Sequence, residues 1–402
     1  MVGHPNLPPA HYIRSLTTDV VWRCAVKAIV IGGGIGGLTA AAALKGRGWT
    51  VGVLERAPAL EPVGSGLAMT PNALRALDTL GIGDRVRELA TFAGDGGIRR
   101  PGGGWLSRTS AEAAAERFGD PTVVLLRATL VDLLRGLLDP AEIRLGVTVE
   151  SAAPDGTVAT SEGAESADLV VAADGIGSGV RSALFPAHPG PRYTGLTAWR
   201  LLAPDPRGSG AFSETWGRGL VFGVNPIAGG RVYCYATAPA AAGTTSPDER
   251  RELLRLFGAW HDPIPELLRW ADPARILRND IFFMPRPLPV LHRDRIVLLG
   301  DAAHPMTPNL GQGACQAIED GVTLAHEVAE GAGLAGYTAA RRDRTAAIMA
   351  RSQQISRLTR MRNPLAVALR DTGMWAAGRL GRNLVLRQAD PVVNWTPPGG
   401  RL

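Results

Sequence analysis

"KAIVIGGGIGGLTAAAALKGRGWTVGVLER", residues 27–56, places five glycines within six residues behind a short apolar run. Residues 27–31 are mostly apolar and β-branched, which predicts a buried parallel strand. The alanine-rich stretch 36–46 predicts a helix, and residues 50–55 predict a second strand. The stretch is therefore expected to form one β-α-β unit, with the glycines at the turn from the first strand into the helix.

The glycines of this turn satisfy the pattern G-x-G-x-x-G at Gly32, Gly34 and Gly37. In that pattern the first glycine permits a tight turn, the second lets the backbone approach a pyrophosphate, and the third lets helix and strand pack closely. Unpaired amides and the positive end of the helix dipole then face the phosphates. Glu55 ends the second strand, where its carboxylate can accept hydrogen bonds from both ribose hydroxyls. The unit is predicted to bind a dinucleotide; NAD and FAD both remain open here, and a glutamate argues against a 2′-phosphate.

The composition is that of a globular protein of 402 residues, a length that predicts two or three domains. Apolar residues make up 45% of the chain, yet no apolar run approaches the roughly 20 residues that span a bilayer. The formal charge is +6, but only Lys27 and Lys45 are lysines, and the arginines are scattered along the chain. A soluble protein is predicted, and nucleic-acid binding is not, because basic clusters with interleaved aromatic residues are missing.

Three cysteines, Cys24, Cys234 and Cys315, lie far apart and outside any C-x-x-C arrangement. Neither a disulfide framework nor a thiol redox pair is predicted, and a reducing cytoplasm fits this cysteine usage. No H-x-x-H pair or carboxylate cluster predicts a metal site. Residues 1–25 lack the features of a signal peptide and are expected to form a loose extension.

Further along, helix-like and strand-like segments alternate. Leucines recur at helical spacing in residues 71–90, where Gly81 interrupts the pattern, and again in residues 127–138. Residues 167–175 and 294–305 each begin as a buried strand that stops abruptly at neighbouring glycine and aspartate residues. Both segments therefore read as buried strands of the same kind as the first one.

The middle of the chain has a different pattern. Residues 219–226 and 230–237 are strand-like runs joined by a turn with proline and glycine, which predicts antiparallel β-structure. The turn-rich segment 93–105 marks a boundary or an excursion. The hundred or so residues after position 305 have a mostly helical pattern, with arginines on the polar faces.

Two of the later stretches resemble the flavin-dependent aromatic hydroxylases, the single-component group A flavoprotein monooxygenases. "LVVAADGIGSGVR", residues 169–181, is similar to their Asp-Gly segment, and "RIVLLGDAAHPMTPNLGQGACQAIEDGVTLAHEV", residues 295–328, to their second FAD segment. The likeness continues in "PVGSGLAMTPNALRALDTLGIGD" (62–84), "YTGLTAWR" (193–200) and "NWTPP" (394–398). The chain is identified as a member of this family, in the branch of zeaxanthin epoxidase, salicylate hydroxylase and 3-hydroxybenzoate hydroxylase.

The resemblance implies an α/β fold. It consists of a Rossmann-like FAD-binding domain of the glutathione reductase and p-hydroxybenzoate hydroxylase type, an inserted antiparallel β-sheet substrate domain and C-terminal helices. The expected boundaries are 26–92, 120–185 and 290–335 for the discontinuous FAD-binding domain, 93–119 and 186–289 for the substrate domain, and 336–402 for the C-terminal helical region.

The resemblance also assigns residues to FAD. Arg127 matches the arginine that contacts the FAD phosphates. Asp174 lies in the Asp-Gly segment, where a role toward the flavin or NADPH competes with simple capping of the turn. Asp301, at a strand end, can accept hydrogen bonds from ribityl hydroxyls, and the backbone amides after Pro308 can face the pyrimidine edge of the flavin. The expected FAD contacts are Gly32, Gly34, Ile35, Gly36, Gly37, Glu55, Arg56, Gly66, Arg127, Asp174, Asp301, Pro308, Gly311, Gln312, Gly313 and Ala314.

The chemistry implied by the resemblance belongs largely to the cofactor. In this family NAD(P)H reduces FAD, the reduced flavin reacts with O2 to a C4a-hydroperoxide, and the distal oxygen passes to the substrate. The expected function is hydroxylation of an aromatic or polycyclic small molecule, with secondary metabolism as one setting. The chain has no second glycine-rich dinucleotide-binding motif after a strand. NADH or NADPH is therefore expected to bind transiently instead of occupying a Rossmann domain of its own.

The substrate is expected between the middle β-region and the flavin. Tyr233 and Tyr235 alternate with small or apolar residues, so one face of their strand is aromatic and can line the pocket, with Trp199 and Pro305 nearby. Ordinary sheet packing is an equal alternative for each of these residues. His304 and Tyr233 are candidate acid–base groups, although family context suggests that His304 holds its loop. A base for a phenolic substrate is not identified.

Several alternatives stay open. Rival functions are epoxidation of an isolated alkene, a flavin-dependent reduction as in the prenyl reductases, and binding of an aromatic ligand without turnover. Glu319 and Asp320 are expected to be structural partners of nearby arginines. The helical stretch 363–381 is expected to pack on the protein, with closure of the pocket or contact with a membrane surface as alternatives. The protein is expected to be a monomer or a homodimer.

Overall fold

The computed structural model describes residues 26–60, 65–90, 94–205, 212–380, 386–387 and 389–399. The predicted extension, residues 1–25, lies outside the described residues, and so does Cys24. The other two cysteines, Cys234 and Cys315, are buried free thiols, as expected for small core residues.

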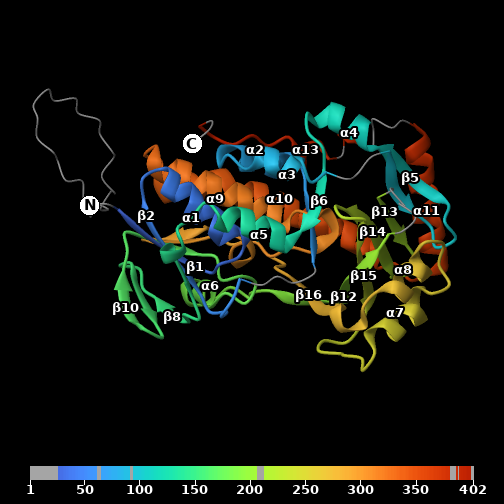
Figure 1. Ribbon diagram of the computed structural model, residues 1–402, viewed down its shortest axis with the longest axis horizontal. Helices are drawn as coiled ribbons and strands as arrows, with labels where there is room; N and C mark the ends of the chain where they lie inside the picture. Colours follow the sequence, from blue (N-terminus) through green and yellow to red (C-terminus); the bar gives the residue numbers. More distant parts are fainter. Residues whose placement is uncertain are drawn as a thin grey trace, which may run out of the picture.

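A six-stranded sheet in the order β17-β18-β11-β1-β2-β7 forms the first layer of the molecule (Figure 1). Its strands are β1 (Lys27–Ile31), β2 (Thr50–Glu55), β7 (Ile143–Leu145), β11 (Leu169–Ala172), β17 (His292–Arg293) and β18 (Ile296–Leu298). All neighbours pair in parallel except β17, which is antiparallel to β18. The three segments predicted as buried strands are buried strands, and they lie side by side in the order β18-β11-β1.

Helices cover this sheet. Helix α1 (Ile35–Gly46) follows the glycine-rich turn and packs against α9 (Gly313–Ala329), which in turn packs against the long α10 (Gly333–Thr359). A Cβ atom at Gly321 would lie only 2.8 Å from the backbone nitrogen of Ala40, so glycine allows the close crossing of α9 and α1. A three-stranded sheet of β8 (Val149–Ala152), β9 (Thr157–Thr160) and β10 (Gly163–Ser166) lies on the side away from α1 (Figure 1).

A seven-stranded sheet in the order β16-β12-β15-β14-β13-β4-β5 forms the second large layer. Its strands are β4 (Asp95–Arg99), β5 (Trp105–Ser110), β12 (Arg192–Pro204), β13 (Ser213–Trp216), β14 (Val221–Ile227), β15 (Arg231–Pro239) and β16 (Leu277–Phe283). Strands β14 and β15 form the predicted antiparallel pair, and only β13 and β4 pair in parallel. The seven strands come from the two segments that the sequence assigns to the substrate domain.

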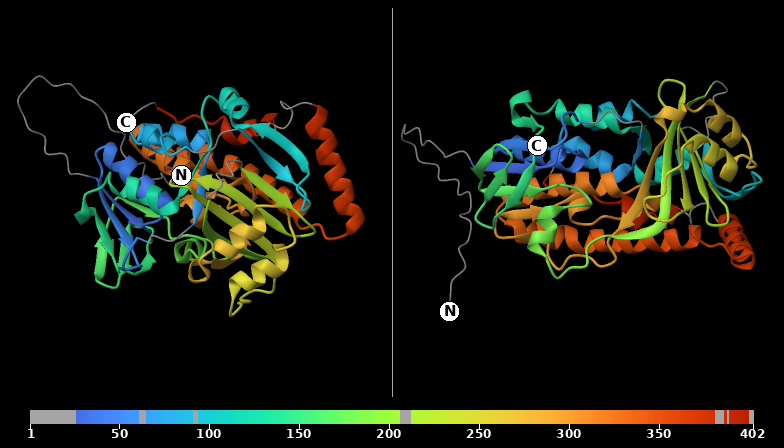
Figure 2. Two further views of the ribbon diagram at one scale, coloured as in Figure 1. Left: turned by 45° about the vertical axis from the view of Figure 1, so that its right-hand side comes forward. Right: turned by 90° about the horizontal axis from the view of Figure 1, so that it is seen from below.

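The two large sheets meet through a short ribbon of β3 (Gly66–Met69) and β6 (Val123–Leu126), which the sequence did not predict. The remaining helices are α2 (Pro71–Thr79), α3 (Gly83–Arg87), α4 (Ala111–Phe118), α5 (Arg127–Arg135), α6 (Gly179–Leu184), α7 (Glu249–Phe257), α8 (Ile264–Trp270), α11 (Pro364–Leu380) and α13 (Asp390–Val393). Gly81 separates α2 from α3, as its position in the leucine pattern predicts. Helix α11 stands at the outer edge of the molecule, beside β5 (Figure 2).

Candidate functional site

The turn between β1 and α1 needs its glycines. Gly32 has a φ of +109°, and a Cβ atom there would overlap the carbonyl oxygen of Ala173 at the end of the neighbouring strand β11. A Cβ atom at Gly37 would overlap the carbonyl oxygen of Gly32. Gly34 caps α1 without any side-chain hydrogen bond, so the first amides of the helix stay available to an anion. The geometry fits a phosphate-binding turn.

Glu55 already has hydrogen-bond partners in the turn. Its Oε2 accepts from the amide of Gly33 at 2.7 Å, and its Oε1 accepts from the amide of Ala57 at 2.9 Å. Each carboxylate oxygen has two lone pairs, so both oxygens can still accept from ribose hydroxyls. Glu55 thus also shapes the glycine-rich turn, a second role that the sequence pattern did not reveal. Arg56 beside it is exposed.

Arg127 supplies a cation at the same turn. It is the first residue of α5, and its amide donates to the carbonyl of Ser65 at 2.8 Å. One guanidinium nitrogen lies 3.8 Å from the position that a Cβ atom of Gly34 would take. Its side chain is exposed and makes no hydrogen bond or ion pair with the residues that the structure describes. A guanidinium in this position is well placed to contact a phosphate of a dinucleotide.

Two aspartates lie where adjacent strands end. Asp174 follows β11, and its Oδ2 accepts from the amide of Val180 at 3.4 Å. Its Oδ1 is buried without a partner among the described residues. Asp301 follows β18 and is exposed. Loss of hydration beside the protein nevertheless raises the pKa of its carboxyl group, against the opposing effect of His304, Arg127 and Arg181. These two carboxylates have the capacity to accept hydrogen bonds from a ligand.

The loop before α9 faces the ribbon strand β3. Gly311 has a φ of +63°, and a Cβ atom there would lie 3.7 Å from the Cβ of Ala68. No side chain caps α9, so its first amides are available, as the prediction for residues 311–314 requires. Gln312 can offer only backbone atoms to a ligand in front of this loop, because its side chain is buried and forms hydrogen bonds with Thr70 at 2.9 Å and with Asn72 at 3.1 Å.

A buried network of charged residues on α9 and α10 supports this loop. Arg341 on α10 is fully buried and donates to Glu319 and to Asp320, the latter at 2.7 Å. Arg344 also pairs with Glu319, at 2.7 Å. The interpretation of Glu319 and Asp320 as structural partners of arginines is therefore confirmed. Burial raises the pKa of Asp320, but His304 and Arg341 outweigh this effect and hold it below its ordinary value.

His304 belongs to this network. Its Nε2 lies 2.5 Å from Oδ2 of Asp320, which also accepts from the amide of Gly300 at 2.8 Å. The imidazole is 2% exposed, and its Nδ1 has no partner among the described residues. This placement favours the interpretation that His304 positions the loop around Asp301 over the alternative that it exchanges protons with a substrate.

The face of the seven-stranded sheet that carries Tyr233 and Tyr235 is directed toward this loop. A Cβ atom at Gly66 on β3 would overlap the ring of Tyr233. Both tyrosines cluster with Ala68, which in turn adjoins Gly311. Burial raises the pKa of Tyr233 to about 12. The two rings therefore lie within one residue layer of the loop that is expected to hold the flavin.

Glu214 is a residue of this face that the sequence did not single out. Its Oε2 accepts from the hydroxyl of Tyr235 and its Oε1 from the indole nitrogen of Trp216. Gly223 on the intervening strand leaves room, because a Cβ atom there would overlap the ring of Tyr235. Burial raises the pKa of Glu214, and the two donors lower it less than burial raises it. No arginine or lysine among the described residues pairs with this carboxylate.

Trp199 is placed differently from the expectation that it lines a substrate pocket. Trp199 lies on the face of the sheet away from Tyr233 and Tyr235, in the core under α7 and α8. There its indole nitrogen donates to Glu249 at 2.7 Å. Successive residues of a strand alternate between faces, so the register of β12 takes Trp199 away from the flavin loop. We therefore leave Trp199 out of the proposed site. Pro305 is buried, and its carbonyl accepts from the amide of Met284 at 2.9 Å.

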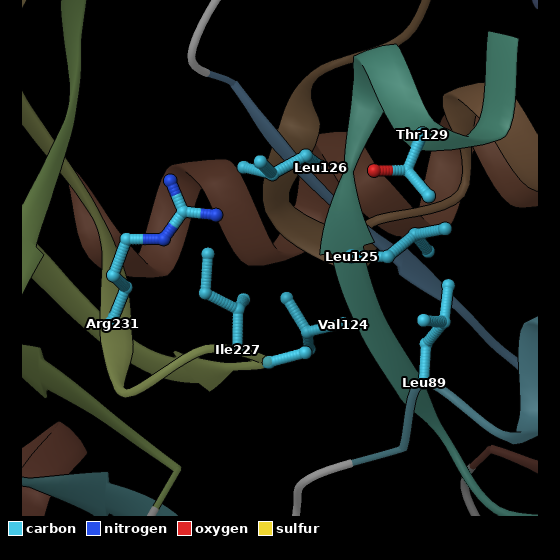
Figure 3. A pocket seen from close by; sticks show the side chains of 8 residues that line it. Leu89, Val124, Leu125, Leu126, Thr129, Ile227 and Arg231 are labelled. Carbon is cyan, nitrogen blue, oxygen red and sulfur yellow. The ribbon is translucent and has the colours of Figure 1, made fainter. Parts of the chain in front are cut away.

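A small cavity lies between β6, α5 and the turn joining β14 to β15 (Figure 3). Figure 3 shows Arg231 and Ile227 on one side of it and Leu89, Val124 and Leu125 on the other. Its volume of about 60 Å³ admits a few water molecules but not an aromatic substrate. A larger hollow of about 600 Å³ is lined by Lys45 and Asp78, near the C-terminal end of α1. The length of α1, about 18 Å, separates that hollow from the phosphate turn.

Comparison with known proteins agrees with this geometry. The family described as "FAD binding domain" matches residues 25–352. Aurachin C monooxygenase/isomerase of Stigmatella aurantiaca is 40% identical over 354 residues, which cover 85% of this chain and 92% of that protein. Chloroplastic zeaxanthin epoxidase of Solanum lycopersicum is 35% identical over 325 residues, 75% of this chain and 48% of that protein.

A solved structure is similar over nearly the whole chain. Klebsiella pneumoniae HpxO in complex with FAD and uric acid is 28% identical and has a TM-score of 0.82, covering 93% of this chain and 98% of that one. Among the described residues, no helix has the length and hydropathy needed to cross a membrane.

Proposed function

Since the chain belongs to the FAD binding domain family and is an FAD-dependent monooxygenase, we propose that it hydroxylates an aromatic or polycyclic small molecule at the sheet face around Tyr233, Tyr235 and Glu214. NAD(P)H and O2 are the co-substrates of this activity. The observation that carries the proposed location is the convergence of β3, the loop before α9 and the aromatic sheet face. Gly66 and Ala68 touch this face on one side, and Ala68 adjoins Gly311 on the other.

The residues around the turn and the strand ends fit FAD. We propose that the glycine-rich turn and Arg127 hold the pyrophosphate, that Glu55 holds the adenosine ribose, and that Asp301 holds the ribityl chain. The amides at the start of α9 then face the flavin ring. Three features support this assignment: the overlap that a Cβ atom at Gly32 or Gly37 would cause, the guanidinium of Arg127, and Oδ1 of Asp174, the last two having no partner among the described residues. When bound, FAD supplies hydride acceptance and oxygen activation.

The chain's own residues orient the substrate and handle its proton. A substrate hydroxyl beside Tyr235 can pass its proton to the tyrosine oxygen while the tyrosine passes its own proton to Oε2 of Glu214. The proton count is conserved, and the negative charge moves from Glu214 to the substrate oxygen, where it makes the ring electron-rich. A raised carboxyl pKa makes Glu214 a better proton acceptor than an ordinary glutamate. Tyr233 is buried and Tyr235 is partly buried, and both pack in an apolar cluster with Val124 and Ile227, which limits the access of water to this transfer.

Isotope labelling tests the proposed function. We would supply the yellow holoenzyme with NADH or NADPH and with labelled O2, and offer aurachin C, uric acid, phenols, indoles and zeaxanthin separately. The expected result is substrate-stimulated NAD(P)H consumption and one labelled oxygen atom on an aromatic carbon of the product. A labelled epoxide would assign the chain to the epoxidases instead, and an unlabelled reduced product would assign it to the reductases. Ligand binding without any NAD(P)H consumption would refute the proposal.

A further inference from the structure

Large apolar side chains stand exposed along one side of α11. Leu365 is 81% exposed and Leu369 is 76% exposed, and Trp375 is 41% exposed. No other large apolar side chain that the structure describes exceeds 42%. Leu365 and Leu369 lie one helical turn apart on the outer side of α11, and we call this side the α11 stripe. Trp375 lies roughly a quarter turn around the helix from the two leucines, at the border of the stripe. In both views of Figure 2 this helix lies at the outer edge of the molecule.

The other side of α11 is firmly packed. Val367 is buried, and the buried Arg370 donates to the carbonyls of Leu358 and Gly217 and to Oδ1 of Asp371. A Cβ atom at Gly378 would lie 3.3 Å from the carbonyl oxygen of Leu106 on β5, so the helix is tightly apposed to that strand. The exposed leucines therefore belong to a helix that is already docked by its opposite face.

The charges of the chain segment that contains α11 are almost all positive. Between positions 345 and 389 the chain has a single acidic residue, Asp371, and that carboxylate is held by Arg370 at 2.8 Å. The arginines of the same segment are Arg351, Arg357, Arg360, Arg362, Arg370, Arg379, Arg382 and Arg387. The exposed Arg379 places its guanidinium 4.1 Å from the ring of Trp375. Exposed leucines together with a tryptophan and exposed arginines are the composition of helices that lie in the surface of an anionic bilayer.

We propose that α11 binds an anionic lipid surface, with the α11 stripe in the acyl boundary and the exposed Arg362 and Arg379 at the lipid phosphates. A helix of 17 residues lying in the membrane plane presents a contact about 25 Å long. A second copy of the chain fits the same surface poorly. In a twofold contact the exposed arginines of one copy would meet those of the other, and like charges would repel.

Vesicle sedimentation of the holoenzyme tests this proposal without any knowledge of the substrate. Binding is expected to vesicles of phosphatidylcholine mixed with phosphatidylglycerol, to be weaker on phosphatidylcholine alone, and to fall with rising salt. L365S/L369S is expected to lower vesicle affinity at least about tenfold, since each leucine loses its burial in the acyl region. L145S, which changes a 40% exposed leucine on β7, is the matched control and is expected to bind like the parent.

A charge reversal provides the second arm. R379E is expected to lower affinity for the anionic vesicles by about tenfold and to change binding to phosphatidylcholine little. R275E, at an arginine that is 82% exposed on the short helix Pro273–Arg275, is its control. Unchanged FAD content and unchanged thermal unfolding show that each variant is folded. The proposal is overturned if the parent ignores anionic vesicles, if variants and controls lose affinity equally, or if L365S/L369S instead abolishes a dimer that forms without lipid.

Discussion

Replacing Arg341 with methionine should expose how strongly the flavin loop depends on the charge network beneath it. The guanidinium is fully buried and bonds to Glu319, to Asp320 at 2.7 Å and to the side chain of Gln316 at 2.8 Å. Removing one partner of a buried ion pair costs about 3–5 kcal/mol, because the remaining charge stays desolvated. Glu319 keeps Arg344 in this variant, so we expect a loss in free energy of unfolding near the lower limit, about 3 kcal/mol.

Urea unfolding of the holoenzyme at a fixed concentration of free FAD measures this loss. R344M is the matched control: the Arg344 side chain is 17% exposed and Glu319 keeps Arg341, so a smaller loss of about 1.5 kcal/mol is expected. FAD affinity should also fall in R341M, because Asp320 fixes the amide of Gly300 next to Asp301. A loss below about 1 kcal/mol in R341M, or a loss no larger than that of R344M, would refute this account of the network.

Three further changes have defined outcomes. G37A should purify with little or no FAD, because the added methyl group overlaps the carbonyl of Gly32. The control G52A has open space around its Cβ position and should stay yellow. Equal flavin absorbance in the two variants would contradict the assigned phosphate turn. D301N should weaken FAD binding by about tenfold through loss of a charged acceptor, as measured by fluorescence quenching of added FAD, and unchanged affinity would remove Asp301 from the site. The pKa of Glu214 is raised in the folded state, so the protonated carboxyl group stabilises the folded protein. This contribution to the free energy of unfolding is fully present below the ordinary carboxyl pKa and is lost as the pH rises through the raised pKa. E214Q should therefore gain stability relative to the parent between pH 5 and pH 8 in urea unfolding, and a constant difference would show that the carboxylate is not perturbed.

Local sequence determined the phosphate turn and the ends of the parallel strands. The positive φ of Gly32 and the crowding at Gly37 arise within one β-α-β unit, so the spacing of the glycines alone reports them. The buried strands are continuous apolar runs, and Asp174 and Asp301 follow them directly in the chain. These features depend on contacts between residues that lie within a few tens of positions of each other in the chain, so a sequence pattern can predict them.

Tertiary structure alone decided the composition of the proposed substrate face. Glu214 meets Tyr235 across β14 because the strand register aligns them and Gly223 leaves the space between them empty. The same register turns Trp199 to the opposite face, although its sequence neighbourhood resembles that of a pocket residue. The partners of Arg341 likewise come from a different helix, and Asn72 joins Glu319 from 247 positions away. Hydrogen bonds of this kind have no periodicity along the chain, because they form only when sheets and helices have packed.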